Sequence, residues 1–173
     1  EEVDAAKNMF LAFSGDGVLD TTKYGQIISH ESASGKIFIN GVLVAQEDNF
    51  LFSYNITHIN TQLKKAINRE RTHVGRSAYT ETVKKILLAS ANADVANLLA
   101  EDMSGFSTGK MHDELGWIDV QEHAVTLLNK SGNIVFLTAT ESMLHPNIVD
   151  EARRNGTKII TIPDNLRSRL SNK

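Results

Sequence analysis

The sequence contains no cysteine among its 173 residues, so it can form no disulfide bond and has no thiolate nucleophile. This absence fits a reducing compartment, and we expect a cytoplasmic protein. No apolar run approaches the length of a membrane-spanning helix. The first residues are acidic where a signal peptide would be basic, and the first is not methionine, which indicates a piece excised from a longer protein.

The sequence also lacks an excess of positive or of negative charge. The formal net charge is −3 and charged residues make up 23% of the chain, values that indicate neither disorder nor a polybasic surface. We therefore expect neither a membrane nor a nucleic acid as a partner. The hydrophobic fraction of 41% is sufficient for one large domain or two small ones.

The order of the predicted elements is mixed. An antiparallel block comes first and a βαβ block comes last, which predicts an α+β arrangement followed by an α/β one. We expect a large α+β block over residues 1–103, a loop or boundary over 104–118, and a small α/β block over 119–173.

The strongest β signal lies at Asn40-Gly41, between the β-branched segments 36–39 and 42–45. Asn-Gly favours a type I′ hairpin turn because both residues tolerate positive φ. The alternative is one long strand with a bulge at Gly41. Residues 21–28 are weakly strand-like, and alternating aromatic residues predict a further strand over 50–56.

Helical spacing of apolar residues predicts three helices, which run through Ile59–Ile67, through Tyr79–Leu87 and through Val95 to about Met103. In the last third, residues 134–142 read as a strand that ends in an acidic turn. A helix from Pro146 to Gly156 and a strand over 158–162 follow.

The first candidate for chemistry is the charged run Asn68–His73, with Arg76 close behind. A solvated helix end is the simplest interpretation of such a run. Helical geometry adds that Arg69 lies roughly 200° from Ile67 at about 100° per residue, opposite the apolar stripe. Arg69 is therefore expected to point outward, where its planar, permanently charged guanidinium could meet a phosphate.

Two other clusters contain residue types that bind metals, but no HExxH spacing is present, and we expect no metal site. Asp119 to Glu122 reads instead as a variant of a capping box that opens a helix. Glu141 follows a strand end without a glycine-rich entry, so we interpret it as a turn or capping residue. The two clusters are His112-Asp113-Glu114 and Asp119-Glu122-His123.

Two groups of segments, in order and at similar spacing, resemble the middle domain of the ninety-kilodalton heat-shock chaperones. The first group contains strand patterns, an arginine-glutamate pair and a helix, at 36–39, 50–54, 68–70 and 83–87. The second contains a strand, a Glu-Ser turn, a proline, a basic pair, a glycine, a strand and an aspartate, at 136–139, 141–142, 146, 153–154, 156, 159–160 and 164. The chain departs from the family at Asn68, where serine is usual, and at His73, where glutamine is usual.

The resemblance implies an α+β fold in which a ribosomal-S5-domain-2-like β/α block precedes helices and a small α/β (βαβ) block. It implies the middle, or transducer, domain of a chaperone ATPase of the GHKL class. ATP with Mg²⁺ would be bound mainly by a separate N-terminal GHKL domain of the same polypeptide. Arg69 would reach the γ-phosphate, Glu70 would hold the catalytic loop, and Arg71 and His73 would be further candidates for phosphate contact.

The same resemblance implies client proteins as partners and a homodimeric full-length protein, while the chain alone would be inactive. Two alternatives remain open. Phe38 to Gly41 is similar to a motif in the transducer domain of MutL-type proteins, which would indicate a nucleic-acid-remodelling GHKL ATPase of the MutL or topoisomerase type. A stand-alone small-molecule enzyme built on the terminal α/β unit is the other, and a deep pocket at the ends of its strands would favour it.

Overall fold

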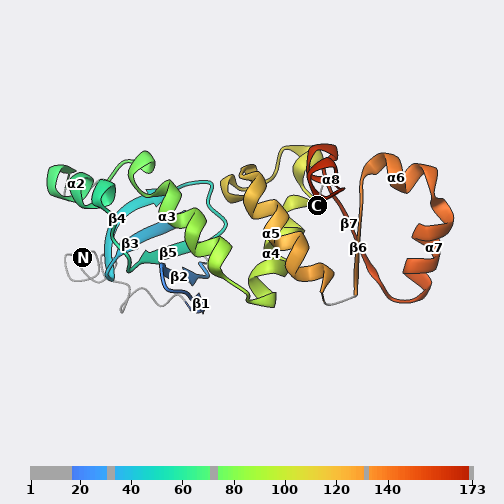
Figure 1. Ribbon diagram of the computed structural model, residues 1–173, viewed down its shortest axis with the longest axis horizontal. Helices are drawn as coiled ribbons and strands as arrows, with labels where there is room; N and C mark the ends of the chain where they lie inside the picture. Colours follow the sequence, from blue (N-terminus) through green and yellow to red (C-terminus); the bar gives the residue numbers. More distant parts are fainter. Residues whose placement is uncertain (1–16, 31–33, 71–73, 131–132, 172–173) are drawn as a thin grey trace. The chain divides into compact units, whose positions relative to one another are not determined.

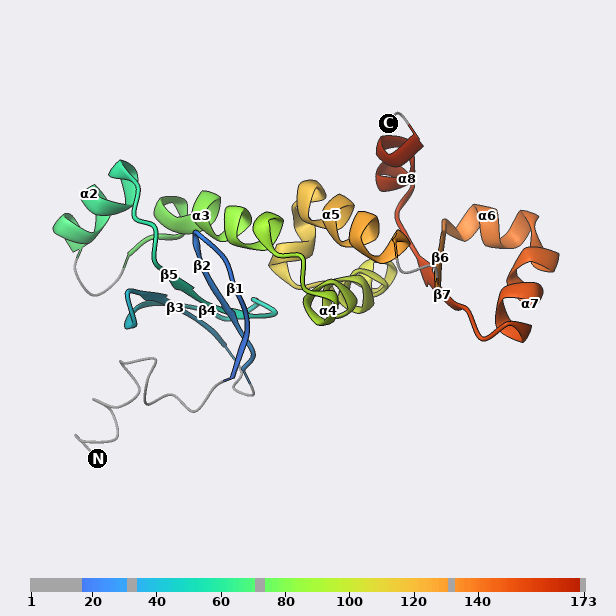
Figure 2. The ribbon, with the colours of Figure 1, turned by 60° about the horizontal axis from the view of Figure 1, so that its bottom comes forward.

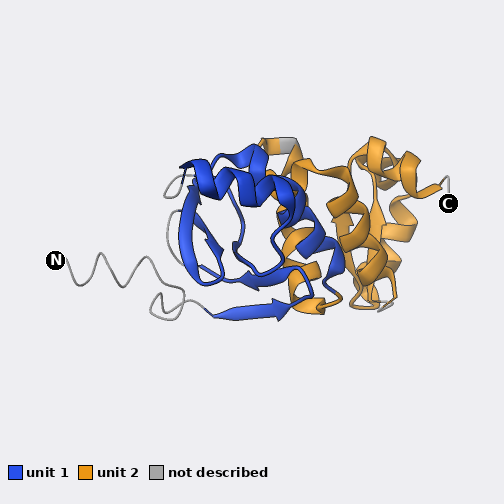
Figure 3. Ribbon diagram, turned by 60° about the vertical axis from the view of Figure 1, so that its left-hand side comes forward, with its two compact units in different colours: residues 1–90 blue, residues 91–173 orange. Residues whose placement is uncertain are grey.

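A computed structural model of the chain describes residues 17–30, 34–70, 74–130 and 133–171. The chain divides into two compact units, Glu1–Ser90 and Ala91–Lys173 (Figure 3). Both combine helices with strands, which confirms the predicted α+β class. Among the helices in these ranges, none is long and apolar enough to cross a lipid bilayer.

The first unit contains a mixed five-stranded sheet (Figure 1). Strand β5 lies at its centre, antiparallel to β2 and parallel to β3, while β1 and β4 form the edges. Its strands are β1 (Val18–Thr21), β2 (Gly25–Ile28), β3 (Gly35–Ile39), β4 (Val42–Glu47) and β5 (Ser53–Ile56).

The turn between β3 and β4 confirms the predicted hairpin. Asn40 and Gly41 have φ values of 47° and 84°, and the flanking residues Ile39 and Val42 are register partners. The alternative of one long strand with a bulge at Gly41 is therefore wrong. A register shift does occur in the hairpin, but it lies between Ile37 and Phe38.

The weak strand signal over 21–28 corresponds to two strands rather than one. The chain reverses after Thr21, where the Thr22 amide and hydroxyl both donate to the carbonyl of Gly25 at 2.8 and 3.0 Å. The Thr22 hydroxyl in turn accepts from the amide of Tyr24 at 3.2 Å. A threonine side chain thus builds a turn that contains neither proline nor Asn-Gly.

Helices α2 (Thr61–Glu70) and α3 (Arg76–Ala89) pack against each other, and both lie above the strands in the view of Figure 2. The buried side chains of α3 include Val83 and Ile86, and this helix packs against β2 and β5. Gly25 allows the close approach, since a Cβ atom there would lie 2.8 Å from the Ile86 Cδ1 atom.

The second unit begins with helix α4 (Ala93–Met103), which packs against helix α5 (Ile118–Asn129). Between them lie the short 3-10 helices η2 (Phe106–Thr108) and η3 (Asp113–Gly116). The division between units therefore falls after Ser90, upstream of the loop over 104–118 where we expected it. The cause is that α4 shares its core with α5.

Helix α5 begins two residues earlier than the capping-box interpretation implies. Trp117 is its N-cap, with φ −87° and ψ 113°, and Asp119 lies within the first turn. A carboxylate there still interacts favourably with the helix dipole. Asp119 is therefore a first-turn acid rather than a cap.

The predicted βαβ unit is confirmed, because β6 (Ile134–Leu137) and β7 (Lys158–Thr161) pair in parallel. Strand β6 is shorter than expected, however, and residues 139–142 belong to helix α6 (Ala139–Leu144). Helix α7 (Pro146–Arg154) has its proline in the first turn, and Gly156 has a φ of 73°, as predicted. Helix α8 (Asp164–Ser171) ends the described chain.

Candidate functional site

Arg69 and Glu70 are the last two residues of α2, and both side chains extend away from the core. The buried residues of this helix are Leu63 and Ala66, in its first two turns. The Arg69 side chain is 75% exposed, which confirms the predicted outward orientation. Its Nε lies 3.8 Å from the Oε1 atom of Glu70, so the guanidinium is only loosely paired.

Glu70 closes the segment that follows the helix. Its Oε2 atom accepts a hydrogen bond from the backbone N–H of Gly75 at 3.3 Å. Arg71 and His73, the further candidates for phosphate contact, lie outside the described residues. The carboxylate next to Arg69 therefore fixes the distance between the end of α2 and the residue that caps α3.

Val74 returns the segment to the edge of the sheet. Its backbone N–H donates to the carbonyl of Val44 in strand β4 at 3.1 Å, and its side chain is buried. A carbonyl of the edge strand is thereby satisfied. The segment after Arg69 is thus attached to the sheet through the main chain of Val74.

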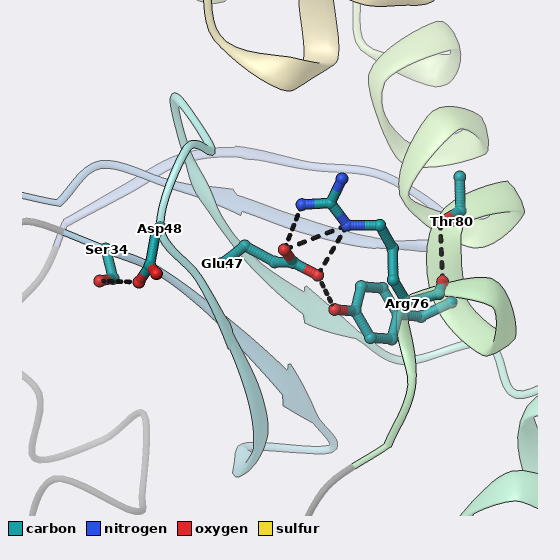
Figure 4. Close-up of polar contacts among 6 residues, drawn as sticks. Ser34, Glu47, Asp48, Arg76 and Thr80 are labelled. Carbon is teal, nitrogen blue, oxygen red and sulfur yellow. Dashed lines mark hydrogen bonds and ion pairs between the residues drawn. The ribbon is translucent and has the colours of Figure 1, made fainter.

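A buried carboxylate makes the third attachment, shown in Figure 4. Glu47, at the end of β4, is 8% exposed and accepts hydrogen bonds from the Arg76 Nε at 3.1 Å to each oxygen. The Nη2 atom of Arg76 and the hydroxyl of Tyr79 also donate to it. We call Glu47, Arg76 and Tyr79 the Glu47 clamp.

The surroundings of the clamp explain its charge state. Burial, with the Glu47 carboxylate as the second cause, raises the pKa of the Tyr79 phenol well above its ordinary value. The phenol therefore stays protonated and remains a hydrogen-bond donor. The Arg76 guanidinium also lies 5.1 Å from the centre of the Phe50 ring, which adds a cation–π contact.

The two described arginines of this segment thus have different tasks. Arg76 is held by Glu47 in a bidentate pair, the strong geometry for this side chain. Arg69 stands exposed at the end of α2, before a segment that Val74 and the Glu47 clamp attach to the sheet. Such an arginine can offer five donors to an external anion such as a phosphate.

The Glu47 clamp was absent from the sequence-based prediction. Glu47 lies two residues beyond the predicted strand segment 42–45, and Arg76 lies 29 residues later, after the charged run Asn68–His73. The hydrogen bond from Val74 to Val44 brings the start of α3 to this end of β4. A buried charge at the end of a predicted strand is a weak signal for such a pair.

The acidic and histidine clusters are engaged within the chain. The Nδ1 of His112 lies 2.5 Å from the Asp102 carboxylate, while Asp119 and Glu122 both bind Arg169 of α8. Within the ranges that the structure describes, no group of three or more histidine or acidic residues is arranged to hold a metal ion.

The polar groups that follow the carboxyl end of β6 are also bonded to other residues of the chain. Glu141 completes a capping box with Thr138, accepting from its amide at 2.9 Å, and also accepts from the Nε of Arg167 at 2.7 Å. The hydrogen bond from the Thr138 amide is the main cause that lowers the pKa of this carboxyl below its ordinary value, and Arg167 lowers it further. Glu141 is a capping residue, as predicted, although it lies inside a helix rather than in a turn.

Comparison with known proteins places the first unit in a family. The family model described as the Mycoplasma pneumoniae MPN635 N-terminal domain matches residues 1–93. Two uncharacterized proteins of Mycoplasma pneumoniae (strain ATCC 29342 / M129 / Subtype 1) are similar to the chain. One is 40% identical over 74 residues, covering 43% of this chain and 30% of the relative. The other is 29% identical over 138 residues, covering 79% and 38%.

The chain spans about a third of the length of these curated relatives, 30% of one and 38% of the other. No solved structure matches it. Neither similarity assigns an activity to this chain, and the residues of the site carry the functional conclusion.

Proposed function

Since the chain belongs to the family of the Mycoplasma pneumoniae MPN635 N-terminal domain, we propose that this domain is the transducer of an ATPase. In this proposal it corresponds to the middle domain of the ninety-kilodalton heat-shock chaperones. Arg69 reaches the γ-phosphate of ATP, which a separate N-terminal GHKL domain of the same polypeptide binds with Mg²⁺. The single observation that supports it most is the exposed Arg69 beside Glu70, whose carboxylate binds the amide of Gly75.

The chemistry asked of Arg69 is electrostatic. In phosphoryl transfer, negative charge spreads over the oxygens of the γ-phosphate, and an arginine from outside the pocket contributes about 10³–10⁵ in rate. Such an arginine must be held in place before the reaction, since its value lies in preorganisation. Glu70, by binding the amide of Gly75, is the positioning residue for this loop.

The wider assembly follows the same proposal. The five-stranded block is proposed to be ribosomal-S5-domain-2-like, and the unit from residue 91 onward to face client proteins or a following domain. The full-length protein would be a cytoplasmic homodimer with a chaperone role in the stress response. The net charge of −3 gives no support to the alternative of a MutL-like or topoisomerase-like ATPase acting on nucleic acid.

The decisive experiment measures ATP turnover of the full-length polypeptide that contains this chain, with Arg69→Ala. We expect kcat to fall by about 10³-fold while ATP affinity, measured by calorimetry, stays within a few fold. Lys65→Ala is the matched control, because Lys65 is an exposed cation one turn earlier on the same helix.

Three outcomes separate the possibilities. Near-normal turnover in Arg69→Ala would reject Arg69 as the catalytic arginine, and Arg71→Ala and His73→Ala would then be measured. An equal loss in Lys65→Ala would indicate a general effect of charge on α2. A full-length polypeptide without ATPase activity would reject the proposed function as a whole.

A further inference from the structure

A second site lies at the other end of α3, in a groove between the β1–β2 turn and the last turns of that helix. The groove is lined by Lys23, Tyr24, Lys85, Leu88 and Ala89, and its volume is about 310 Å³. This volume is at the lower end of the range for small-molecule sites, roughly 300–1,000 Å³. We call it the Tyr24 groove.

The floor of the groove is held firmly. The Tyr24 carbonyl accepts hydrogen bonds from the amides of Thr57 and His58 at 3.1 and 3.2 Å. The His58 ring meets the Tyr24 ring edge to face, with centroids 5.8 Å apart and planes at 80°. Tyr24, in the β1–β2 turn, is therefore held by its backbone and ring contacts to the segment after β5.

Two ammonium groups converge on this ring. The Nζ of Lys23 lies 5.0 Å from the ring centroid and the Nζ of Lys85 lies 5.9 Å from it. Both distances fall within cation–π range, which limits where the two charges can move. Two positive charges thus lie beside the same ring in the lining of a small groove.

The two lysines of the groove differ from the adjacent Lys84 in how they are paired. Within the part of the chain that the structure describes, neither lysine pairs with a carboxylate, whereas the adjacent Lys84 lies 3.9 Å from Glu81. Asp20 of β1 is engaged elsewhere, since it accepts from the Ser90 hydroxyl and from the Thr21 amide. The two like charges repel each other, and a dianion between them would remove that cost.

We propose that the Tyr24 groove binds a small phosphomonoester, with its phosphate between Lys23 and Lys85. Phosphate offers several strong acceptors to two ammonium donors. Leu88 is 36% exposed and, with the neighbouring Ala89, offers apolar surface to the organic part of the ligand. The small volume and two cations suit one phosphate group better than the extended, charged backbone of a nucleic acid.

This site is independent of the proposed role of Arg69. Arg76 opens α3, whereas Lys85, Leu88 and Ala89 belong to its last two turns. The helix has 14 residues, which at 1.5 Å per residue separates its ends by roughly 20 Å. A failure of either proposal therefore leaves the other standing.

The test is a titration of the isotope-labelled 173-residue chain with phenyl phosphate, followed by backbone amide NMR at constant ionic strength. We expect saturable shifts at Lys23, Tyr24, Lys85 and Leu88. Lys85→Ala should weaken binding about tenfold, the effect of losing one charge-assisted hydrogen bond. Lys84→Ala, the matched control on the same helix, should change affinity less than twofold.

Further ligands decide the chemistry. Phenol, which lacks the phosphate, should cause no saturable shift, and binding equal to that of phenyl phosphate would overturn the proposal. An oligothymidylate that binds more than tenfold more tightly than phenyl phosphate would overturn it in favour of a nucleic-acid site. Equal losses of affinity in Lys84→Ala and Lys85→Ala would overturn the proposal in favour of a general attraction between charges.

A second variant keeps the test valid if Lys85→Ala disturbs the fold. Lys23 lies exposed in the β1–β2 turn, so Lys23→Ala should leave the amide spectrum outside the groove unchanged. It should weaken phenyl phosphate about as much as Lys85→Ala does. Unchanged affinity in both variants, with native spectra, would reject the site.

Discussion

Arg76 and Glu47 join the start of α3 to the end of the edge strand β4, with the arginine Nε equidistant from both carboxylate oxygens at 3.1 Å (Figure 4). The carboxylate is nearly buried while the arginine side chain is about half exposed. The pair therefore lies at the boundary of the core, where desolvation is partial and hydrogen bonding to a charged group has a measurable value.

Replacement of Glu47 by glutamine should lower the free energy of unfolding of the first unit by about 1–3 kcal/mol, because Arg76 and Tyr79 lose a charged acceptor. Urea unfolding followed by the amide signals of residues 17–90 measures this change. The control is Asp48→Asn, since Asp48 is exposed and accepts from the Ser34 hydroxyl at 3.0 Å (Figure 4). We expect the control to stay within about 0.5 kcal/mol. Equal effects in the two variants would contradict the clamp.

Gly25→Ala should destabilise the first unit by roughly 1–3 kcal/mol or more, through overpacking. A Cβ atom there would lie 2.3 Å from the Asn55 carbonyl oxygen and 2.8 Å from the Ile86 Cδ1. The Asn55 atom belongs to the backbone of the adjacent strand and cannot rotate away. Circular dichroism during thermal unfolding gives the measurement.

Gly75→Ala is the matched substitution for that experiment. Nothing lies within 4 Å of a Cβ atom at Gly75, and its φ of −68° and ψ of 150° suit any residue. We expect a change within about 1 kcal/mol, because the stiffer unfolded chain offsets the preference for glycine over alanine at an N-cap. A loss as large as that of Gly25→Ala would show that close packing is not the cause.

Gly41→Ala should cost about 1–2 kcal/mol for a different reason. A Cβ atom at Gly41 meets nothing within 4 Å, but its φ of 84° is unfavourable for an L side chain. The cost is therefore one of backbone conformation alone. Gly116→Ala, equally open and without a positive φ, should be nearly neutral in a parallel thermal unfolding measurement.

Glu141 predicts a pH dependence for the second unit. Its folded pKa lies below the ordinary value of 4.5, so its contribution to stability is present above about pH 4.5 and is lost as the pH falls through the folded pKa. Glu141→Gln should therefore flatten the acid side of the stability profile relative to the unsubstituted chain.

The fluorescence of Trp117, the one tryptophan of the sequence, reports on this unit during urea unfolding. The difference between the two profiles isolates Glu141 from the other carboxylates. Parallel profiles below pH 4.5 would contradict the lowered pKa. An opposite sign, with the glutamine variant losing stability faster in acid, would do the same.

The turns and helix ends that depend on a few neighbouring residues were predicted correctly from the sequence. Asn40-Gly41 was identified as a hairpin turn because few other dipeptides accept two positive φ values. Pro146 and Gly156 were placed at the start and end of a helix for comparable reasons. The outward direction of Arg69 followed from helical periodicity alone, with Leu63 and Ala66 on the buried face.

The features that failed or were missed depend on contacts distant in sequence. The division after Ser90 follows from the packing of α4 on α5, which no composition shift announces. Helix α6 is the exception, because its cause is local: Thr138 and Glu141, three residues apart, cap each other where the sequence was interpreted as a strand end and a turn. The Tyr24 groove joins a turn to a helix end about 60 residues later, so no motif could reveal it.

The order of the sheet, β1-β2-β5-β3-β4, has a consequence for how the first unit acquires its structure. The central strand is the last of the five to leave the ribosome, whereas the hairpins on either side are local and can form early. Until β5 arrives, β2 and β3 each present an unpaired edge, the state in which sheets are prone to associate with other chains. The first unit is therefore most exposed to wrong association while the ten residues from Glu47 to Ile56 are being synthesised, because its sheet is incomplete until β5 pairs.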